Sequence, residues 1–127
     1  MCSGDPLTGG WTLTWVPETA PPERLAIARA PGSAPGVPLA QDLAALRAAG
    51  IRHIICLLED AEFLHLPGDW VAGSWSGAVE AGGFALHRIP VEDYTAPTRA
   101  QVARLLRLVG DALGRDEGVL IHCMAGL

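Results

Sequence analysis

The last residues of the chain contain the feature that most constrains its fold. Residues 118–123 form an apolar, partly β-branched run that ends in His122 and Cys123, and a turn of small residues follows. Such a run is typical of a strand that is covered on both faces in a parallel sheet. In open sheets of this kind, functional residues gather where the strands end. The run therefore predicts an α/β fold with Cys123 at the carboxyl edge of a sheet.

Strand and helix patterns alternate upstream of this run. Strand–helix–strand–helix–strand over residues 51–123 implies right-handed crossovers and a mostly parallel central sheet flanked by helices. With 127 residues, the chain is long enough for one domain with its own core. We expect a loose N-terminal segment with a short edge strand at 1–23, and a core at 24–127. The predicted strands are 11–15, 25–28, 53–58, 84–89 and 118–123.

Three helices are expected between these strands. The first spans 39–49, and Asp69 is expected to cap the second, at 70–81. Thr98 and Gln101 fit a capping box for the third helix. Apolar residues at helical spacing predict the buried stripe of that third helix: Val102, Leu105, Leu106, Val109 and Leu113.

Cys123 and the residues after it suit the binding and attack of a phosphate group. A phosphate monoester is anionic, so the site must hold an anionic nucleophile and also cancel the charge of the substrate. A thiolate is a strong nucleophile, and its pKa falls beside positive charge or a helix N-terminus. Main-chain amides in a loop of small residues can converge on phosphate oxygens, and such a loop would begin with Met124, Ala125, Gly126 and Leu127. The alternative is that Cys123 is only a buried thiol at the end of a strand and does not react.

A second motif follows the strand predicted at 84–89. It reads Ile-Pro-Val-Glu-Asp-Tyr-Thr-Ala-Pro-Thr over residues 89–98 and leads into a helix. If the strands are parallel, Asp93 lies on the same sheet edge as Cys123. A carboxylic acid there could protonate the leaving oxygen and then act as a base on water. Glu92 is the competing carboxylate, and Asp in a Pro-rich loop can also be only a turn residue.

Together these motifs resemble the dual-specificity protein phosphatases, and more closely the kinase-associated phosphatase (cyclin-dependent kinase inhibitor 3) family and its bacterial relatives. The resemblance covers roughly residues 24–127. It implies that Cys123 is the nucleophile that forms a phosphocysteine intermediate and that Asp93 is the general acid. It also implies that His122 hydrogen-bonds around the loop and helps to keep the thiolate charged.

The family signature is His-Cys-(x)5-Arg, and the sequence stops two positions before that Arg. The truncated chain is therefore expected to be inactive, because an Arg fork grips two phosphate oxygens. In the related phosphatases a helix after the loop packs on the sheet. Without it we expect an open sheet face near 54–58 and 119–121 and self-association of the fragment, whereas the full-length protein would be a monomer.

Two other functions stay open at this point. One is a non-catalytic, phosphoprotein-binding pseudophosphatase, which the residue at the Arg position would distinguish from an enzyme. The other is a rhodanese-like sulfurtransferase, which also places a reactive cysteine in an anion-binding loop. The motif around Asp93 disfavours the sulfurtransferase, because sulfur transfer has no alkoxide to protonate.

Charge and composition limit the partners. The net charge is −5 with no basic stripe, which argues against nucleic acid, and no basic amphipathic or bilayer-length apolar stretch indicates a membrane. The expected substrate is a phosphoprotein or a small phosphate ester. Three cysteines without pairing rhythm, and no signal peptide, indicate the cytoplasm. Cys56 is interpreted as a core thiol, with a redox partner of Cys123 as the alternative. The histidines lack ligand spacing, so neither metal nor cofactor is expected.

Overall fold

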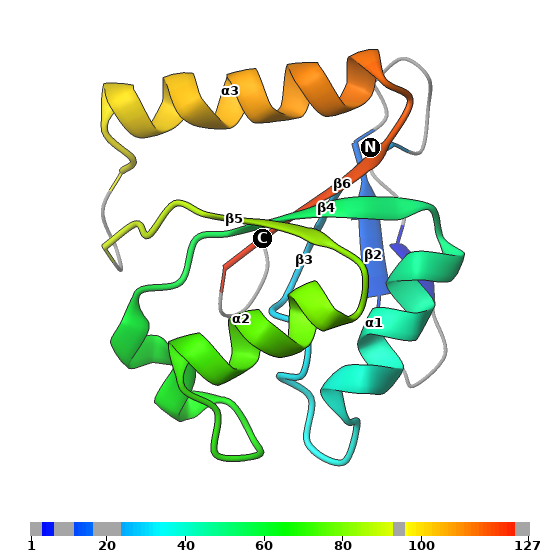
Figure 1. Ribbon diagram of the computed structural model, residues 1–127, viewed down its shortest axis with the longest axis vertical. Helices are drawn as coiled ribbons and strands as arrows, with labels where there is room; N and C mark the ends of the chain where they lie inside the picture. The colour runs from blue at the N-terminus through cyan, green and yellow to red at the C-terminus, as the bar shows by residue number, and fades with distance from the viewer. Residues whose placement is uncertain (1–3, 7–11, 17–23, 93–95, 124–127) are drawn as a thin grey trace.

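The structure is a computed structural model that describes residues 4–6, 12–16, 24–92 and 96–123. Six strands and four helices follow one another in these segments (Figure 1). The strands are β1 (Gly4–Pro6), β2 (Thr12–Trp15), β3 (Leu25–Ala28), β4 (Ile51–Cys56), β5 (Ala85–Arg88) and β6 (Gly118–His122). The helices are α1 (Leu39–Ala48), the 3-10 helix η1 (Asp60–His65), α2 (Ala72–Ala81) and α3 (Arg99–Gly114).

The strands form one sheet in the order β1-β2-β3-β6-β4-β5. β3, β6, β4 and β5 are parallel, whereas β1, β2 and β3 pair antiparallel. The predicted α/β class with a mostly parallel central sheet is therefore confirmed. The prediction that the strand near 11–15 lies at an edge is wrong, because β1 pairs along its outer side.

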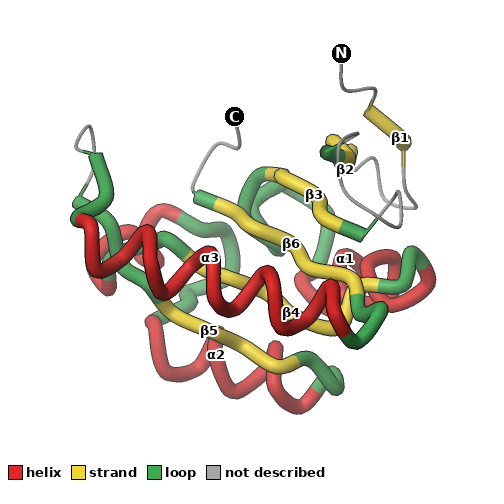
Figure 2. The backbone as a smooth tube through the Cα atoms, turned by 90° about the horizontal axis from the view of Figure 1, so that it is seen from above, coloured by secondary structure: helices red, strands yellow, loops and turns green. Residues whose placement is uncertain are grey.

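Helices cover the two faces of the sheet unequally (Figure 2). α1, α2 and η1 pack on one face and enclose the larger core, which includes Leu46, Phe63 and Trp75. Of the helices in the described residues, only α3 lies across the other face, where the fully or nearly fully buried apolar residues are Ile55, Ile89, Ala112 and Val119. The two cores therefore differ greatly in size.

The start of α2 differs from the prediction. The helix begins at Ala72, with Val71 as its N-cap residue, and the Ser74 hydroxyl accepts a hydrogen bond from the Val71 amide at 3.1 Å. Asp69 does not cap it, because Gly68 and Asp69 both have positive φ, at 104° and 57°, and turn the chain before the helix starts.

α3 confirms its predicted cap but only part of its predicted stripe. The Thr98 hydroxyl accepts the Gln101 amide at 3.1 Å, and the Gln101 side chain accepts the Thr98 amide at 2.8 Å. Leu105 and Val109 pack on the sheet together with Leu108. Val102 and Leu106 were expected inside but are 38% and 66% exposed, because one helix on a sheet face buries a narrow stripe.

The expectation of an open sheet face is wrong for most of the residues concerned. Ile54, Cys56 and Leu58 are fully buried in the larger core, and α3 covers Ile55 and Val119. Leu57 and Ile121 are only partly buried. Successive side chains of a strand point to opposite faces of the sheet, so these residues are distributed over both faces, and each face has at least one helix on it.

Candidate active site

Four parallel strands end together at one edge of the sheet. His122 is aligned with Ala28 of β3 and Cys56 of β4, and Cys56 is aligned with Arg88 of β5. The pairing continues past the strand ends, because the Leu57 amide donates to the His122 carbonyl at 3.0 Å. Cys123, partly exposed, leaves the sheet at this edge. The predicted position of Cys123 is thereby confirmed.

The segment that leads to Asp93 leaves the same edge. β5 and β6 are both parallel to β4, which lies between them. The Val91 amide donates to the Leu57 carbonyl at 3.0 Å, and Glu92 is exposed. Asp93 itself and the loop residues Met124, Ala125, Gly126 and Leu127 lie outside the described residues. The described chain thus brings together the two strand ends from which these residues follow.

His122 is fully buried directly before the candidate nucleophile. Its Nδ1 lies 3.1 Å from the Cys123 carbonyl oxygen, which can only accept, so the hydrogen is on Nδ1. Burial lowers the pKa of His122 to about 4; the carbonyl contact opposes this shift, and the Arg88 charge adds to it. At neutral pH the imidazole is uncharged. It can therefore orient the Cys123 peptide but contributes no net positive charge to a thiolate.

A column of rings supports His122 from the side of the larger core. The ring of Trp75 lies 5.5 Å from that of His122, and the ring of Phe63 lies 5.2 Å from that of Trp75. The Arg88 guanidinium follows, 5.0 Å from the centre of the Phe63 ring. The rings are tilted against one another, by 57° for Trp75 and His122 and by 54° for Phe63 and Trp75, and all three side chains are fully buried. Trp75 is a packing residue of the larger core, since its side chain is fully buried there.

Cys56 belongs to the larger core. Its side chain is fully buried, and burial raises the pKa of the thiol, although the nearby Arg88 charge and hydrogen bonds oppose the shift. A thiol that resists ionisation is a poor nucleophile. The interpretation of Cys56 as a buried core thiol is confirmed.

A buried carboxylate holds the turn after β3. Asp42 of α1 accepts the Gly32 amide at 2.8 Å and lies 3.7 Å from Arg29. Burial raises the pKa of Asp42, and the Gly32 amide and Arg29 reduce that effect. The Trp75 indole also donates to the Pro31 carbonyl at 3.1 Å. The sequence gives no sign that Asp42 is buried, since an acidic residue in a first helical turn is common at exposed positions.

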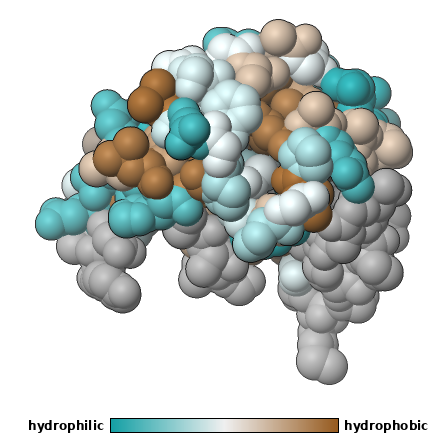
Figure 3. All heavy atoms as spheres, turned by 90° about the horizontal axis from the view of Figure 1, so that it is seen from below, coloured by the Kyte–Doolittle hydropathy of each residue, from teal (hydrophilic) through white to brown (hydrophobic). Residues whose placement is uncertain are grey.

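A groove lies between the loop after β3 and the loop before α2. Figure 3 shows the face on which these two loops lie, where hydrophobic residues are set among hydrophilic ones. The groove has a volume of about 370 Å³ and a mostly apolar lining. Its lining residues are Gly32, Ala34, Gly36, Val37, Pro38, Leu39, Pro67, Gly68 and Trp70.

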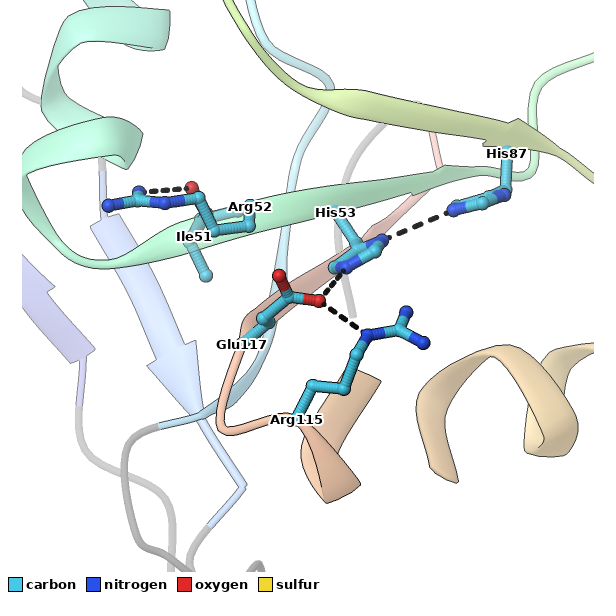
Figure 4. A network of polar contacts seen from close by, with 6 residues as sticks. All are labelled: Ile51, Arg52, His53, His87, Arg115 and Glu117. Atoms are coloured by element: carbon cyan, nitrogen blue, oxygen red, sulfur yellow. Dashed lines mark hydrogen bonds and ion pairs between the residues drawn. The ribbon is translucent and has the colours of Figure 1, made fainter. Parts of the chain in front are cut away.

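Two histidines form a separate polar network on the α3 side of the sheet (Figure 4). His53 Nδ1 lies 3.3 Å from His87 Nε2, and His53 Nε2 lies 2.8 Å from Glu117, which also accepts from Arg115. Within the described residues, no group of three or more His, Cys, Asp or Glu side chains is arranged to hold a metal ion. In the same part of the chain, no helix has the length and apolar character needed to cross a membrane.

A cysteine that follows a buried histidine at the carboxyl edge of a mostly parallel sheet is the arrangement of a cysteine-dependent phosphatase. Residues 30–127 match the sequence profile of the family described as "Polymorphic toxin system, DSP-PTPase phosphatase". The chain belongs to this family.

Solved phosphatases have a similar fold. Kinase-associated phosphatase, crystallised with its catalytic cysteine changed to serine, superposes with a TM-score of 0.77 at 18% identity, over 92% of this chain and 66% of its own. Tk-PTP in its active form gives 0.60 at 27% identity, over 82% and 59%. TpbA of P. aeruginosa, solved in complex with phosphotyrosine, gives 0.52 at 19%, over 80% and 49%. The chain therefore spans about half to two thirds of the length of these proteins.

Proposed function

We propose that this chain is the nucleophile-bearing part of a cysteine-dependent protein phosphatase of the tyrosine or dual-specificity type. The observation that carries the proposal is the place of Cys123, partly exposed where β6 ends, in a chain of the phosphatase family. The activity needs the whole phosphate-binding loop, which Met124, Ala125, Gly126 and Leu127 begin.

The reaction has two steps. The Cys123 thiolate attacks phosphorus, an S–P bond forms, and the bond from phosphorus to the leaving oxygen breaks while Asp93 gives that oxygen a proton. In the second step Asp93, now a carboxylate, takes a proton from water, which attacks phosphorus, breaks the S–P bond and releases inorganic phosphate. His122 supports this chemistry as a neutral group that orients the Cys123 carbonyl.

The proposed substrate is a phosphoprotein or a small phosphate ester. Phosphotyrosine is the first ligand to test, because TpbA was solved with it. No cofactor, metal, nucleic acid or membrane takes part in the proposed reaction. A free thiolate needs a reducing compartment, so we place the protein in the cytoplasm, as one domain that is monomeric when full length.

The test uses an extended chain, in which residues 1–127 continue through the loop Arg and the helix after it. Cys123→Ser should abolish turnover of 4-nitrophenyl phosphate. Asp93→Ala should slow phenyl phosphate about 10²-fold or more and 4-nitrophenyl phosphate far less, because a poor leaving group depends more on the acid. Turnover that survives Cys123→Ser would refute the proposal. A larger effect from Glu92→Ala would transfer the acid role to Glu92. Phosphotyrosine binding without turnover would indicate a binding module.

A further inference from the structure

Arg88 is the last residue of β5, and its side chain binds the segment that follows β4. We call the segment directly after the last residue of a strand the exit of that strand. Its NH1 lies 2.7 Å from the Asp60 carboxylate, and its NH2 donates to the Leu58 carbonyl at 2.5 Å. Both partners belong to the segment that follows β4. The guanidinium also covers the Phe63 ring at 5.0 Å. Only 24% of the Arg88 side chain is exposed, so this is an ordered contact between two chain segments and not a surface charge.

The backbone after Arg88 is held as well. The Arg88 carbonyl accepts from Arg104 of α3 at 3.0 Å, and the Pro90 carbonyl accepts from the Gln101 side chain at 2.6 Å. The Ile89 and Val91 amides donate to the Cys56 and Leu57 carbonyls at 2.9 and 3.0 Å. The exit of β5 is thus attached on one side to α3 and on the other to the exit of β4.

The exit of β4 is in turn attached to the strand that carries the nucleophile, because the Leu57 amide donates to the His122 carbonyl. The Arg88 side chain therefore completes a series of direct contacts. The series runs from the segment before Asp93, through the segment after β4, to the segment before Cys123. The Arg88 charge also contributes to the lowered pKa of His122.

We propose that Arg88 is a positioning residue for the general acid, which it holds in register with Cys123 by fixing the exit of β5 against the exit of β4. The proposal rests on the proposed phosphatase function. A general acid acts only within about 2.6–3.2 Å of the leaving oxygen. A displacement of about 1 Å can cost about 10² in rate. Arg suits the task because its planar fork binds a carboxylate and a carbonyl at once, which a Lys ammonium does not reproduce.

The test is a leaving-group comparison in the extended chain. Arg88→Met should lower kcat/KM for phenyl phosphate at least about tenfold more than for 4-nitrophenyl phosphate. Arg88→Lys should restore part of this loss. Asp60→Asn, at an 81% exposed position, should give a smaller effect in the same direction and keeps the test valid if Arg88→Met does not fold. Arg52→Met is the matched control, because the Arg52 guanidinium donates to the carbonyls of Arg47 in α1 and Ile51 at the start of β4, at the opposite end of that strand from Cys56.

A double-mutant cycle separates positioning from mere stabilisation. In the Asp93→Ala background, Arg88→Met should cause no further loss, because the group that it positions is gone. Equal losses for both leaving groups, or an undiminished loss in the Asp93→Ala background, would overturn the positioning role. If Cys123→Ser keeps activity, the proposed function fails and this proposal fails with it. If Cys123→Ser and Asp93→Ala behave as expected and Arg88→Met and Asp60→Asn do not, only the role of Arg88 is refuted.

Discussion

His122 is placed where burial decides its protonation state. It has no contact with solvent, and its ring packs against Trp75 while Nδ1 donates to the Cys123 carbonyl. The same desolvation that keeps it neutral makes the fold sensitive to acid. In the unfolded chain this side chain is hydrated and takes up a proton near its ordinary pKa of about 6.5.

The stability of the fold should therefore fall as the pH decreases from about 6.5 towards 4. The folded-state pKa of His122, about 4, lies below the unfolded value, so the unfolded state binds the proton first. The whole shift corresponds to about 3 kcal/mol, of which about 2 kcal/mol is lost between pH 7 and pH 5. Urea unfolding of the 127-residue chain at both pH values measures this loss.

The matched variant is His122→Asn, which keeps a donor for the Cys123 carbonyl but does not titrate. It should flatten the dependence between pH 7 and pH 5. Some slope remains, because the pKa of His87 is also lowered, first by burial and then by the charges of His53 and Arg104. An unchanged loss of stability in His122→Asn would show that other groups cause it.

The effect of a glycine-to-alanine substitution on stability should depend on the element that contains the glycine, as two positions illustrate. Gly118 begins β6 beside the register irregularity of β4, and a Cβ built there lies 2.5 Å from the Gly50 carbonyl oxygen. Gly110 lies inside α3, and a Cβ there meets nothing within 4 Å. The first neighbour is backbone and cannot move aside without disturbing the strand pairing.

Gly118→Ala should destabilise the fold by about 1–3 kcal/mol, as for other overpacked sites. Gly110→Ala should stabilise it by about 0.5–1 kcal/mol, because alanine favours the helix and restricts the unfolded chain. Denaturant unfolding of the two variants beside the parent chain measures both changes. The same sign for both substitutions would contradict this account.

At the scale of the whole molecule, the helices on the two faces of the sheet pack on apolar cores of unequal size. α1 and α2 share the larger core with fully buried Leu46 and Trp75, whereas α3 buries only Ala112 completely and exposes 66% of Leu106. A layer with few buried contacts can open without unfolding of the rest.

Native-state hydrogen exchange should therefore show that the interior amides of α3 open at a lower free energy than those of β4 and α1. The physical reason is that opening of α3 exposes the smaller core alone. Thr98→Ala, which removes the cap of α3, should lower that free energy by about 0.5–2 kcal/mol and leave the β4 amides unchanged. If α3 exchanges only with global unfolding, the two layers are one cooperative unit.

The class of fold and the position of Cys123 could be predicted from the sequence because both depend on local patterns. An apolar run of this length is typical of a buried strand, so residues 118–123 locate Cys123 at a sheet edge without any knowledge of its neighbours. The Thr98 cap is equally local, since its partner is three residues away. The cap expected at Asp69 failed because a turn with positive φ intervenes.

Only the tertiary structure decided what lies beside these elements. Periodicity identifies the apolar residues of α3, but what packs against the helix determines its rotation, so Leu108 is inside and Leu106 is outside. Arg88 reaches partners that are 28 and 30 residues away in the chain. Asp42 and His122 become buried polar groups because α1 and α2 pack on the face of the sheet that carries the larger core. Hydrogen bonds and burial of this kind depend on distances in space, which the spacing of residues along one chain does not contain.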